Sequence, residues 1–248
     1  MIRLTSNAPT TRGMPRRVEA EWLDVMPACD PRAIRSRQDL RVVNRLLRST
    51  RTVVSALDSL VDPAQPLHLV ELGAGDGSLM LQLAQRRSAQ WRDVKVTLLD
   101  RHPLISSGTL AALQACGWRV EIVEADVFRW LAQPVVPAEA IILSNLFVHH
   151  FEGAELDRLL VGIARKAKAF VCCEPRRSGV ALTGSYLLGA IGCNEVTRHD
   201  AVLSVRAGFR DDELSSRWPK FANSGEAWQL SETAAGMFSH CFIARRGA

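Results

Sequence analysis

One short segment of the chain combines a carboxylate with three closely spaced glycines. Glu71 stands two residues before Gly73, and Gly75 and Gly77 follow at alternate positions. Glycine lets a backbone turn sharply and approach a bound ligand closely. The carboxylate would repel a pyrophosphate but attracts a ligand that carries an ammonium group. The segment therefore predicts a binding loop for a ligand with a positively charged end.

A second chemically capable group consists of two adjacent histidines, His149 and His150, which follow the polar pair Ser144-Asn145. Histidine is the side chain suited to accept a proton near neutral pH. Either histidine is therefore a candidate general base for a reaction at a weakly acidic hydroxyl. The alternative is that both are loop histidines that shape a pocket.

These residues must be positioned by the elements around them. Helical segments alternate with short apolar runs, which are predicted strands at 67–72, 94–100, 119–123, 140–143 and 169–173. Such alternation predicts a parallel sheet covered on both faces. The glycine segment then lies after the first strand, where an open α/β sheet places its ligand crevice. Two late strands, at 227–230 and 238–244, predict an antiparallel hairpin at the sheet edge.

The glycine spacing separates two ligands that such sheets bind. A dinucleotide loop has the spacing GxGxxG, whereas this chain has GxGxG, with Ser78 where the third dinucleotide glycine would stand. Glu71 through Gly77 resembles the first motif of class I S-adenosylmethionine-dependent methyltransferases. The resemblance implies an α/β fold with a Rossmann-like, seven-stranded, mostly parallel sheet and a C-terminal antiparallel hairpin. It also implies S-adenosylmethionine as the cofactor.

The resemblance covers residues 67–174 and assigns cofactor contacts at further strand ends. It implies that Asp100 binds the ribose hydroxyls, since a carboxylate can accept both hydrogen bonds. It implies that Asp126 bonds the adenine amino group, and that Ser144 and Asn145 lie beside the methionine moiety. The implied cofactor residues are Glu71, Gly73, Ala74, Gly75, Gly77, Asp100, Arg101, Asp126, Val127, Ser144 and Asn145.

The histidine pair resembles the catalytic turn of small-molecule O-methyltransferases. Matching their His-Asp-Trp motif to His149-His150-Phe151 implies that His149 is the base, while His150 in the place of Asp leaves His150 as the alternative. The Asn/Asp-Pro-Pro-aromatic stretch of amino-methylating enzymes and the paired glutamates of protein arginine methyltransferases are missing at this turn. Only Glu174 is available as a carboxylate for metal-dependent chemistry after strands four and five, so no metal is expected.

Two segments outside the sheet are expected to roof the acceptor site. Residues 1–64 predict a loose arm and a helical cap, in which an amphipathic helix runs from Asp30-Pro31 to before Asp62-Pro63. Residues 65–248 form the predicted methyltransferase domain, with 176–210 as a cap insertion after strand five. Residues 197–206 of the insertion, together with the turn at 146–150 and residues 21–30, resemble a bacterial group related to quinone-biosynthesis methyltransferases. Members of that group often accompany type III polyketide synthases. His199 and Arg206 within the insertion are candidate acceptor contacts, with a structural role as the alternative.

Composition limits the setting of this chemistry. The 248 residues are 47% hydrophobic and 23% charged, which excludes a disordered tail. The net charge of +5 comes mostly from arginines spread along the chain, whereas nucleic-acid binding needs clustered charge. No apolar run is long enough to span a membrane, and six cysteines without a CxxC pair favour reduced thiols. We expect a cytoplasmic protein, with a homodimer possible, and neither a nucleic-acid nor a membrane partner.

The leading functional hypothesis is O-methylation of a small phenolic or polyketide-type metabolite with a histidine base. One alternative is C-methylation of a quinol-like ring, where the histidine would deprotonate a hydroxyl to activate the ring. Two others are a cofactor-binding protein without catalysis and an RNA methyltransferase.

Overall fold

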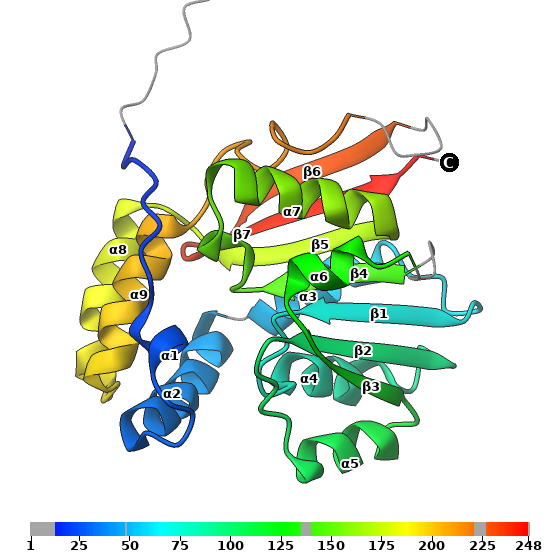
Figure 1. Ribbon diagram of the computed structural model, residues 1–248, viewed down its shortest axis with the longest axis horizontal. Coiled ribbons are helices and arrows are strands. Elements are labelled where there is room, and N and C mark those ends of the chain that lie inside the picture. The colour runs from blue at the N-terminus through cyan, green and yellow to red at the C-terminus, as the bar shows by residue number, and fades with distance from the viewer. Residues whose placement is uncertain (1–12, 48, 135–139, 221–226, 248) are drawn as a thin grey trace, which may run out of the picture.

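The computed structural model describes residues 13–47, 49–134, 140–220 and 227–247, and its centre is a seven-stranded sheet (Figure 1). The strand order is β3-β2-β1-β4-β5-β7-β6, and β7 is antiparallel to both β5 and β6. This arrangement confirms the predicted α/β fold with its mostly parallel sheet and C-terminal hairpin. The strands are β1 (Leu67–Leu72), β2 (Val94–Asp100), β3 (Arg119–Glu124), β4 (Ala140–Asn145), β5 (Ala167–Pro175), β6 (Trp228–Ala235) and β7 (Ser239–Arg246).

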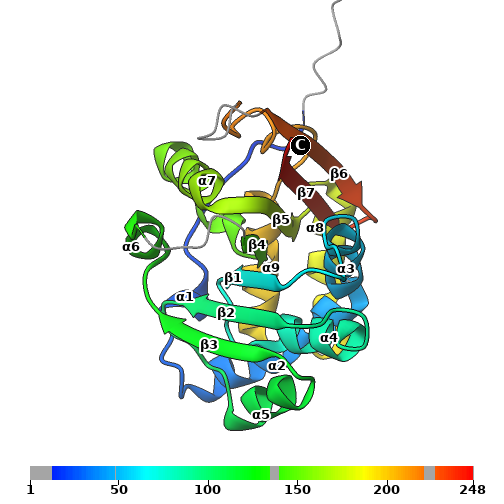
Figure 2. The ribbon, with the colours of Figure 1, turned by 90° about the vertical axis from the view of Figure 1, so that its right-hand side faces the viewer.

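Helices cover both faces of the sheet, which is why its central strands are apolar on both sides. Figure 2 shows α3 and α4 on one side of the sheet and α6 and α7 on the other. Each face of the sheet has its own hydrophobic core. Along β4, Ile141 and Leu143 belong to one core, whereas Ala140 and Ile142 belong to the other. These helices are α3 (Ser49–Asp58), α4 (Ser78–Arg87), α5 (Ser107–Ala115), α6 (Val127–Ala132) and α7 (Gly153–Lys166).

A further group of helices stands at the carboxyl ends of the parallel strands (Figure 1). The group contains α1 (Trp22–Val25), α2 (Pro31–Leu47), α8 (Gly179–Tyr186), the 3₁₀ helix η2 (Leu187–Ile191) and α9 (Glu195–Ala207). The insertion predicted at 176–210 is therefore largely helical, and α9 contacts both α1 and α2. Its end is fixed to β5 so closely that a Cβ on Gly208 would lie 2.2 Å from the carbonyl oxygen of Pro175.

The single N-terminal helix predicted from Asp30-Pro31 to before Asp62-Pro63 is wrong. In the structure this segment forms two helices, α2 and α3, with residue 48 between them outside the described chain. The division has a packing reason, because α3 buries Val53, Val54 and Leu57 against the sheet whereas α2 packs against α9. Of the predicted loose arm, residues 1–12 lie outside the described part. Among the described helices, none has the length and apolar character needed to cross a membrane.

Candidate active site

The glycine loop between β1 and α4 has a conformation that requires glycine. Gly73, Gly75 and Gly77 have φ values of 70°, 54° and 72°, in the left-handed region. A Cβ on Gly73 would lie 2.4 Å from Cδ2 of Phe147, whereas a Cβ on Gly75 would meet no atom within 4 Å. The N–H groups of Gly73 and Ala74 both donate to the carbonyl of Leu99, which ties the loop to β2. The loop is therefore packed at Gly73 and open at Gly75.

Buried polar atoms without partners gather at the ends of β1 and β4. Glu71 is 3% exposed, and its Oε2 has no hydrogen-bond partner among the described residues. Burial, together with the charges of Asp76 and Asp100, raises the pKa of Glu71 well above its usual value. Ser144 Oγ and Asn145 Oδ1, on the strand paired with β1, lack partners in the same way. Leaving such groups unpaired is costly, so this edge is suited to a polar, cationic ligand.

The predicted residues at the ends of β2 and β3 lie beside this edge. Asp100 accepts hydrogen bonds from the N–H of Gly75 and of His102, both at 2.8 Å. Each of its oxygens keeps a further lone pair for a ligand hydroxyl. Asp126 caps α6 through Oδ1, its Oδ2 lies 3.2 Å from Nη2 of Arg101, and the following Val127 is buried. The structure thus brings together the side chains that the sequence predicts for the cofactor.

The turn after β4 holds both histidines in the 3₁₀ helix η1 (Val148–His150). Leu146, which precedes the turn, has a φ of 56°, an uncommon conformation for a residue other than glycine. The backbone N–H groups of Phe147, Val148 and His149 all donate to the carboxylate of Glu174 on β5. This carboxylate, which is fully buried, also lies 2.7 Å from Nδ1 of His149. Glu174 therefore fixes both the turn and the His149 ring.

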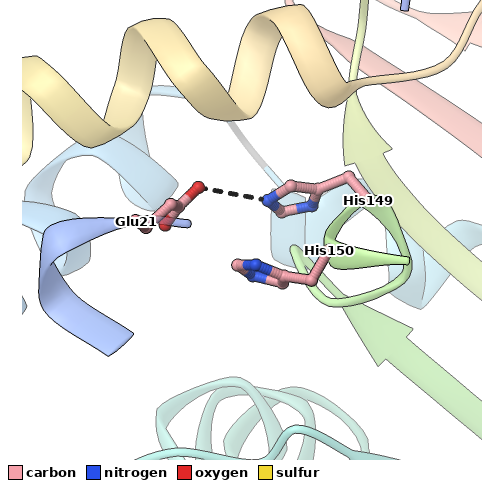
Figure 3. A group of neighbouring side chains, drawn as sticks. All are labelled: Glu21, His149 and His150. Atoms are coloured by element: carbon pink, nitrogen blue, oxygen red, sulfur yellow. Dashed lines mark ion pairs between the residues drawn. The ribbon is translucent and has the colours of Figure 1, made fainter. Parts of the chain in front are cut away.

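The other ring nitrogen of His149 points toward the N-terminal segment (Figure 3). Nε2 of His149 lies 3.5 Å from Oε1 of Glu21 and has no hydrogen-bond partner among the residues that the structure describes. Burial would lower the pKa of His149, but its interactions with Glu174 and Glu21 outweigh burial and raise the pKa to about 9. Burial and the neighbouring His149 charge lower the pKa of His150 to about 4. At neutral pH a cationic His149 therefore lies beside a neutral His150.

These residues also offer a possible set of metal ligands. One ligand atom each from Glu21, His149 and His150 lies within 4.8 Å of the others. A proton on His149 balances the charge of the two carboxylates that flank it, Glu174 and Glu21. The two imidazole rings are tilted against each other, with ring centroids 4.2 Å apart and planes inclined by 32°. That no metal is bound stays a prediction.

The two candidate acceptor contacts lie on α9. His199 Nδ1 is 2.8 Å from Oδ1 of Asp200, and its ring stacks on Trp22 at a centroid distance of 3.8 Å. Nη2 of Arg206 lies 3.4 Å from the hydroxyl of Tyr186. The roles of His199 and Arg206 toward an acceptor stay predictions.

Sequence reasoning did not assign acid–base roles to Glu21, Asp24 or Glu174. A signal for Glu174 existed, because it ends the strand beside β4, and the ends of neighbouring parallel strands lie together. Glu21 lies far from the histidines in the chain and carries no local signal. Asp24 Oδ2 lies 3.5 Å from Nδ1 of His150, and burial and the Glu21 charge raise the pKa of Asp24 to about 6.

Comparison with known proteins establishes the fold as that of methyltransferases. An O-methyltransferase family protein from Burkholderia thailandensis superposes with a TM-score of 0.55 at 18% identity, over 89% of this chain and 61% of that one. The plantazolicin methyltransferase BpumL in complex with SAH gives a TM-score of 0.58 at 10% identity, over 88% of this chain and 92% of the other.

In sequence, no family model matches the chain. A 76-residue stretch, 30% of the chain, is 29% identical to the tRNA1(Val) (adenine(37)-N6)-methyltransferase of Glaesserella parasuis serovar 5 (strain SH0165). That stretch spans 31% of the tRNA enzyme, and the chain spans less than two thirds of the Burkholderia protein. These likenesses show the shared fold, and activity and substrate must be argued from the site.

Proposed function

We propose that this protein is an S-adenosylmethionine-dependent methyltransferase that methylates an oxygen of a small phenolic or polyketide-type molecule. The observation that carries the proposal is Glu71, a buried carboxylate with one oxygen that has no hydrogen-bond partner in the described part of the chain, next to the glycine loop that is open at Gly75. A carboxylate in that state needs a cationic or hydrogen-bond-donating ligand.

The polar side chains at the strand ends fit S-adenosylmethionine. Glu71 would hold its ammonium group, Asp100 its ribose hydroxyls and Asp126 its adenine, with Ser144 and Asn145 beside the methionine moiety. When bound, this cofactor supplies an electrophilic methyl group on a sulfonium centre. Among the neighbours in fold, BpumL was crystallised with SAH, which supports the same cofactor here.

The chain itself supplies a base and its orienting group. We assign His149 as the residue whose Nε2 takes the proton of the acceptor hydroxyl, because Nδ1 is held by the buried Glu174. Only the neutral form of His149 can accept this proton, and because its pKa is about 9 that form becomes the main one only as the pH rises through 9. A base oriented by a third group is the arrangement by which enzymes fix the tautomer and direction of an imidazole. His150 remains the alternative base, since it is neutral at physiological pH and lies against the same ring.

Two other functions have weaker support from the site. The partial likeness to a tRNA adenine methyltransferase covers 76 residues, and β4 here ends in Ser144-Asn145-Leu146-Phe147, without the Pro-Pro stretch expected of amino-methylating enzymes. C-methylation of a quinol-like ring would use the same histidine to activate a ring hydroxyl. Product NMR distinguishes the two small-molecule reactions, because an O–CH₃ signal supports our proposal and a C–CH₃ signal supports the alternative.

The test begins with calorimetry of the purified protein against S-adenosylmethionine and its demethylated form. Turnover of a panel of phenols is then compared for His149→Ala, His150→Ala and the double variant. Loss of a general base lowers kcat by about 10²- to 10⁴-fold, and we expect this loss in His149→Ala with cofactor affinity within about twofold of wild type. The control is His68→Gln, at the opposite end of β1.

Each step has an outcome that contradicts it. Absence of binding to both forms of the cofactor removes the proposal as a whole. Near-full turnover in the double variant removes the histidine base but leaves the methyltransferase assignment.

We further propose a cytoplasmic enzyme without nucleic-acid or membrane partners. Light scattering on the same preparations tests for the homodimer.

A further inference from the structure

The described residues of the N-terminal segment before α2 are bonded to the histidine turn and to α9. We call residues 13–26 the strap. Arg16 donates hydrogen bonds to the backbone carbonyls of His149 at 3.0 Å, Phe151 at 2.9 Å and Ala207 at 2.7 Å. The backbone of Arg17 donates to the carbonyl of Arg206 at 3.1 Å. The strap is therefore bonded to the histidine turn and to α9 at the same time.

One buried carboxylate on α9 determines where the strap places its side chains. Asp200, which is 4% exposed, accepts hydrogen bonds from the N–H of Trp22 and of Leu23, each at 2.9 Å. Glu21 directly precedes these two residues, and its carboxylate accepts a hydrogen bond from the hydroxyl of Ser204, one turn further along α9. The position of Glu21 thus follows from two contacts with α9.

These contacts direct the Glu21 carboxylate at Nε2 of His149, the ring nitrogen that Glu174 does not contact. Glu174 occupies Nδ1 of His149, and the Glu21 carboxylate faces Nε2 across 3.5 Å (Figure 3). His149 is 2% exposed, so solvent competes little with either contact. An imidazolium in this place is balanced on both sides, whereas a neutral imidazole leaves Glu21 without a counter-charge.

We propose that Glu21 is a positioning residue for methyl transfer. The strap places its carboxylate beside His149, where it holds the imidazole ring and the proton on that ring. The kinetic part of this inference rests on the proposed function. The transfer starts from the neutral form of His149: the acceptor O–H bond breaks, and its proton moves to the unprotonated Nε2 of His149. The oxygen lone pair forms the new O–C bond as the methyl–sulfur bond breaks and the sulfur keeps that electron pair. Glu21 stays ionised throughout and pairs with the imidazolium.

The electrostatic surroundings of His149 support this role. Burial opposes the charge of His149, and the two carboxylates that raise its pKa to about 9 come from different elements, Glu174 from β5 and Glu21 from the strap. Glu21 responds reciprocally: burial works against its ionisation, but His149 lowers its pKa. Among the described residues, further charged or titratable groups near the Glu21–His149 pair are Asp24 and Arg16 on the strap, His150 on η1 and Asp200 on α9.

The first experiment measures the protonation of His149 directly and needs no turnover. The full-length chain, labelled with ¹⁵N-histidine and kept in EDTA, is titrated by NMR as wild type and as Glu21→Gln. The amide keeps the size of Glu21 and its bond to Ser204 but removes the charge. Loss of one close opposite charge lowers a pKa by about 1 to 3 units, so we expect the His149 pKa to fall by at least about one unit. Glu19→Gln is the matched control, because it removes the same charge from an exposed strap position.

The second experiment follows the same variants through turnover. In Glu21→Gln the acid limb of the kcat profile should move to lower pH with the His149 pKa, and the plateau should fall about tenfold because the ring is less well held. KM for the cofactor should not change. Glu21→Asp keeps the charge, so it should retain the high His149 pKa while losing rate.

The inference is overturned if the His149 pKa is the same in wild type and Glu21→Gln, or falls equally in Glu19→Gln. If Glu21→Gln does not fold, a His149 pKa in Glu21→Asp that has dropped to its ordinary value also overturns it. A protein that shows the NMR shift but transfers no methyl group would contradict the proposed function and leave the Glu21–His149 coupling standing.

Discussion

The buried carboxylate of Glu71 lowers the stability of the folded protein. Its carboxylate is buried, one oxygen has no hydrogen-bond partner in the described chain, and two neighbouring carboxylates add repulsion. Its raised pKa means that ionisation at neutral pH opposes folding. The same features prepare it for a cationic ligand, so stability and binding conflict at this residue.

Replacing Glu71 by Gln should therefore separate the two effects. We expect the ligand-free variant to be more stable by about 1–3 kcal/mol, because the amide has no charged form for burial, Asp76 and Asp100 to disfavour. We expect its affinity for S-adenosylmethionine to fall at least about tenfold. Denaturant unfolding and calorimetry measure the two quantities. Glu124→Gln, at the exposed end of β3, is the control. A less stable variant with unchanged affinity would contradict this account of Glu71.

At the scale of elements, the site depends on the docking of the strap against α9. The first turn of α1 has no side-chain cap of its own, and Asp200 on α9 satisfies two of its N–H groups instead. A four-residue helix cannot persist without such support, because helix nucleation is unfavourable. The position of the strap is thus decided by α9, far away in the sequence.

Asp200→Ala should release the strap while leaving the sheet folded. Two N–H groups lose their acceptor, at a cost of about 1–3 kcal/mol, and local opening of residues 13–26 becomes easier. Hydrogen exchange followed by mass spectrometry should show faster exchange in the strap and unchanged exchange in β1 and β4. Glu195→Ala, at an exposed position on the same helix, should exchange like wild type. Unchanged protection of the strap in Asp200→Ala would show that Asp200 is not its anchor.

At the scale of the whole molecule, the histidine pair couples folding to pH in two directions. His149 has a folded pKa near 9, above its unfolded value, so its contribution to stability is complete below about pH 6.5 and is lost as pH rises through 9. His150 has a folded pKa near 4, so the fold favours its neutral form, and that contribution is lost as pH falls from about 6.5 through 4.

The alkaline side of this dependence can be measured with His149→Gln. Between pH 6.5 and 9 the wild-type protein should lose on the order of 2–3 kcal/mol of unfolding free energy that the variant does not lose. Urea unfolding at several pH values gives both curves, and their difference removes the contributions of other titrating groups. Parallel curves would mean that His149 is not held as a cation in the folded protein.

Local sequence was sufficient to predict the sheet and the glycine loop after its first strand. Strand periodicity and the glycine spacing depend on neighbouring residues, because a left-handed turn needs glycine wherever the fold places it. The five parallel strands were predicted close to their observed bounds. The division between α2 and α3 was missed, because it depends on which surface each half of the segment packs against.

The amino-acid sequence by itself determined the class of fold and put Glu71, Asp100 and the histidine pair at strand ends. Only the tertiary structure decided what surrounds His149. Glu174 reaches it from a neighbouring strand, and Glu21 reaches it from a strap that α9 holds in place. The physical reason is that an imidazole's charge is determined by the carboxylates within a few ångströms of it, and here they come from chain segments that no local pattern connects.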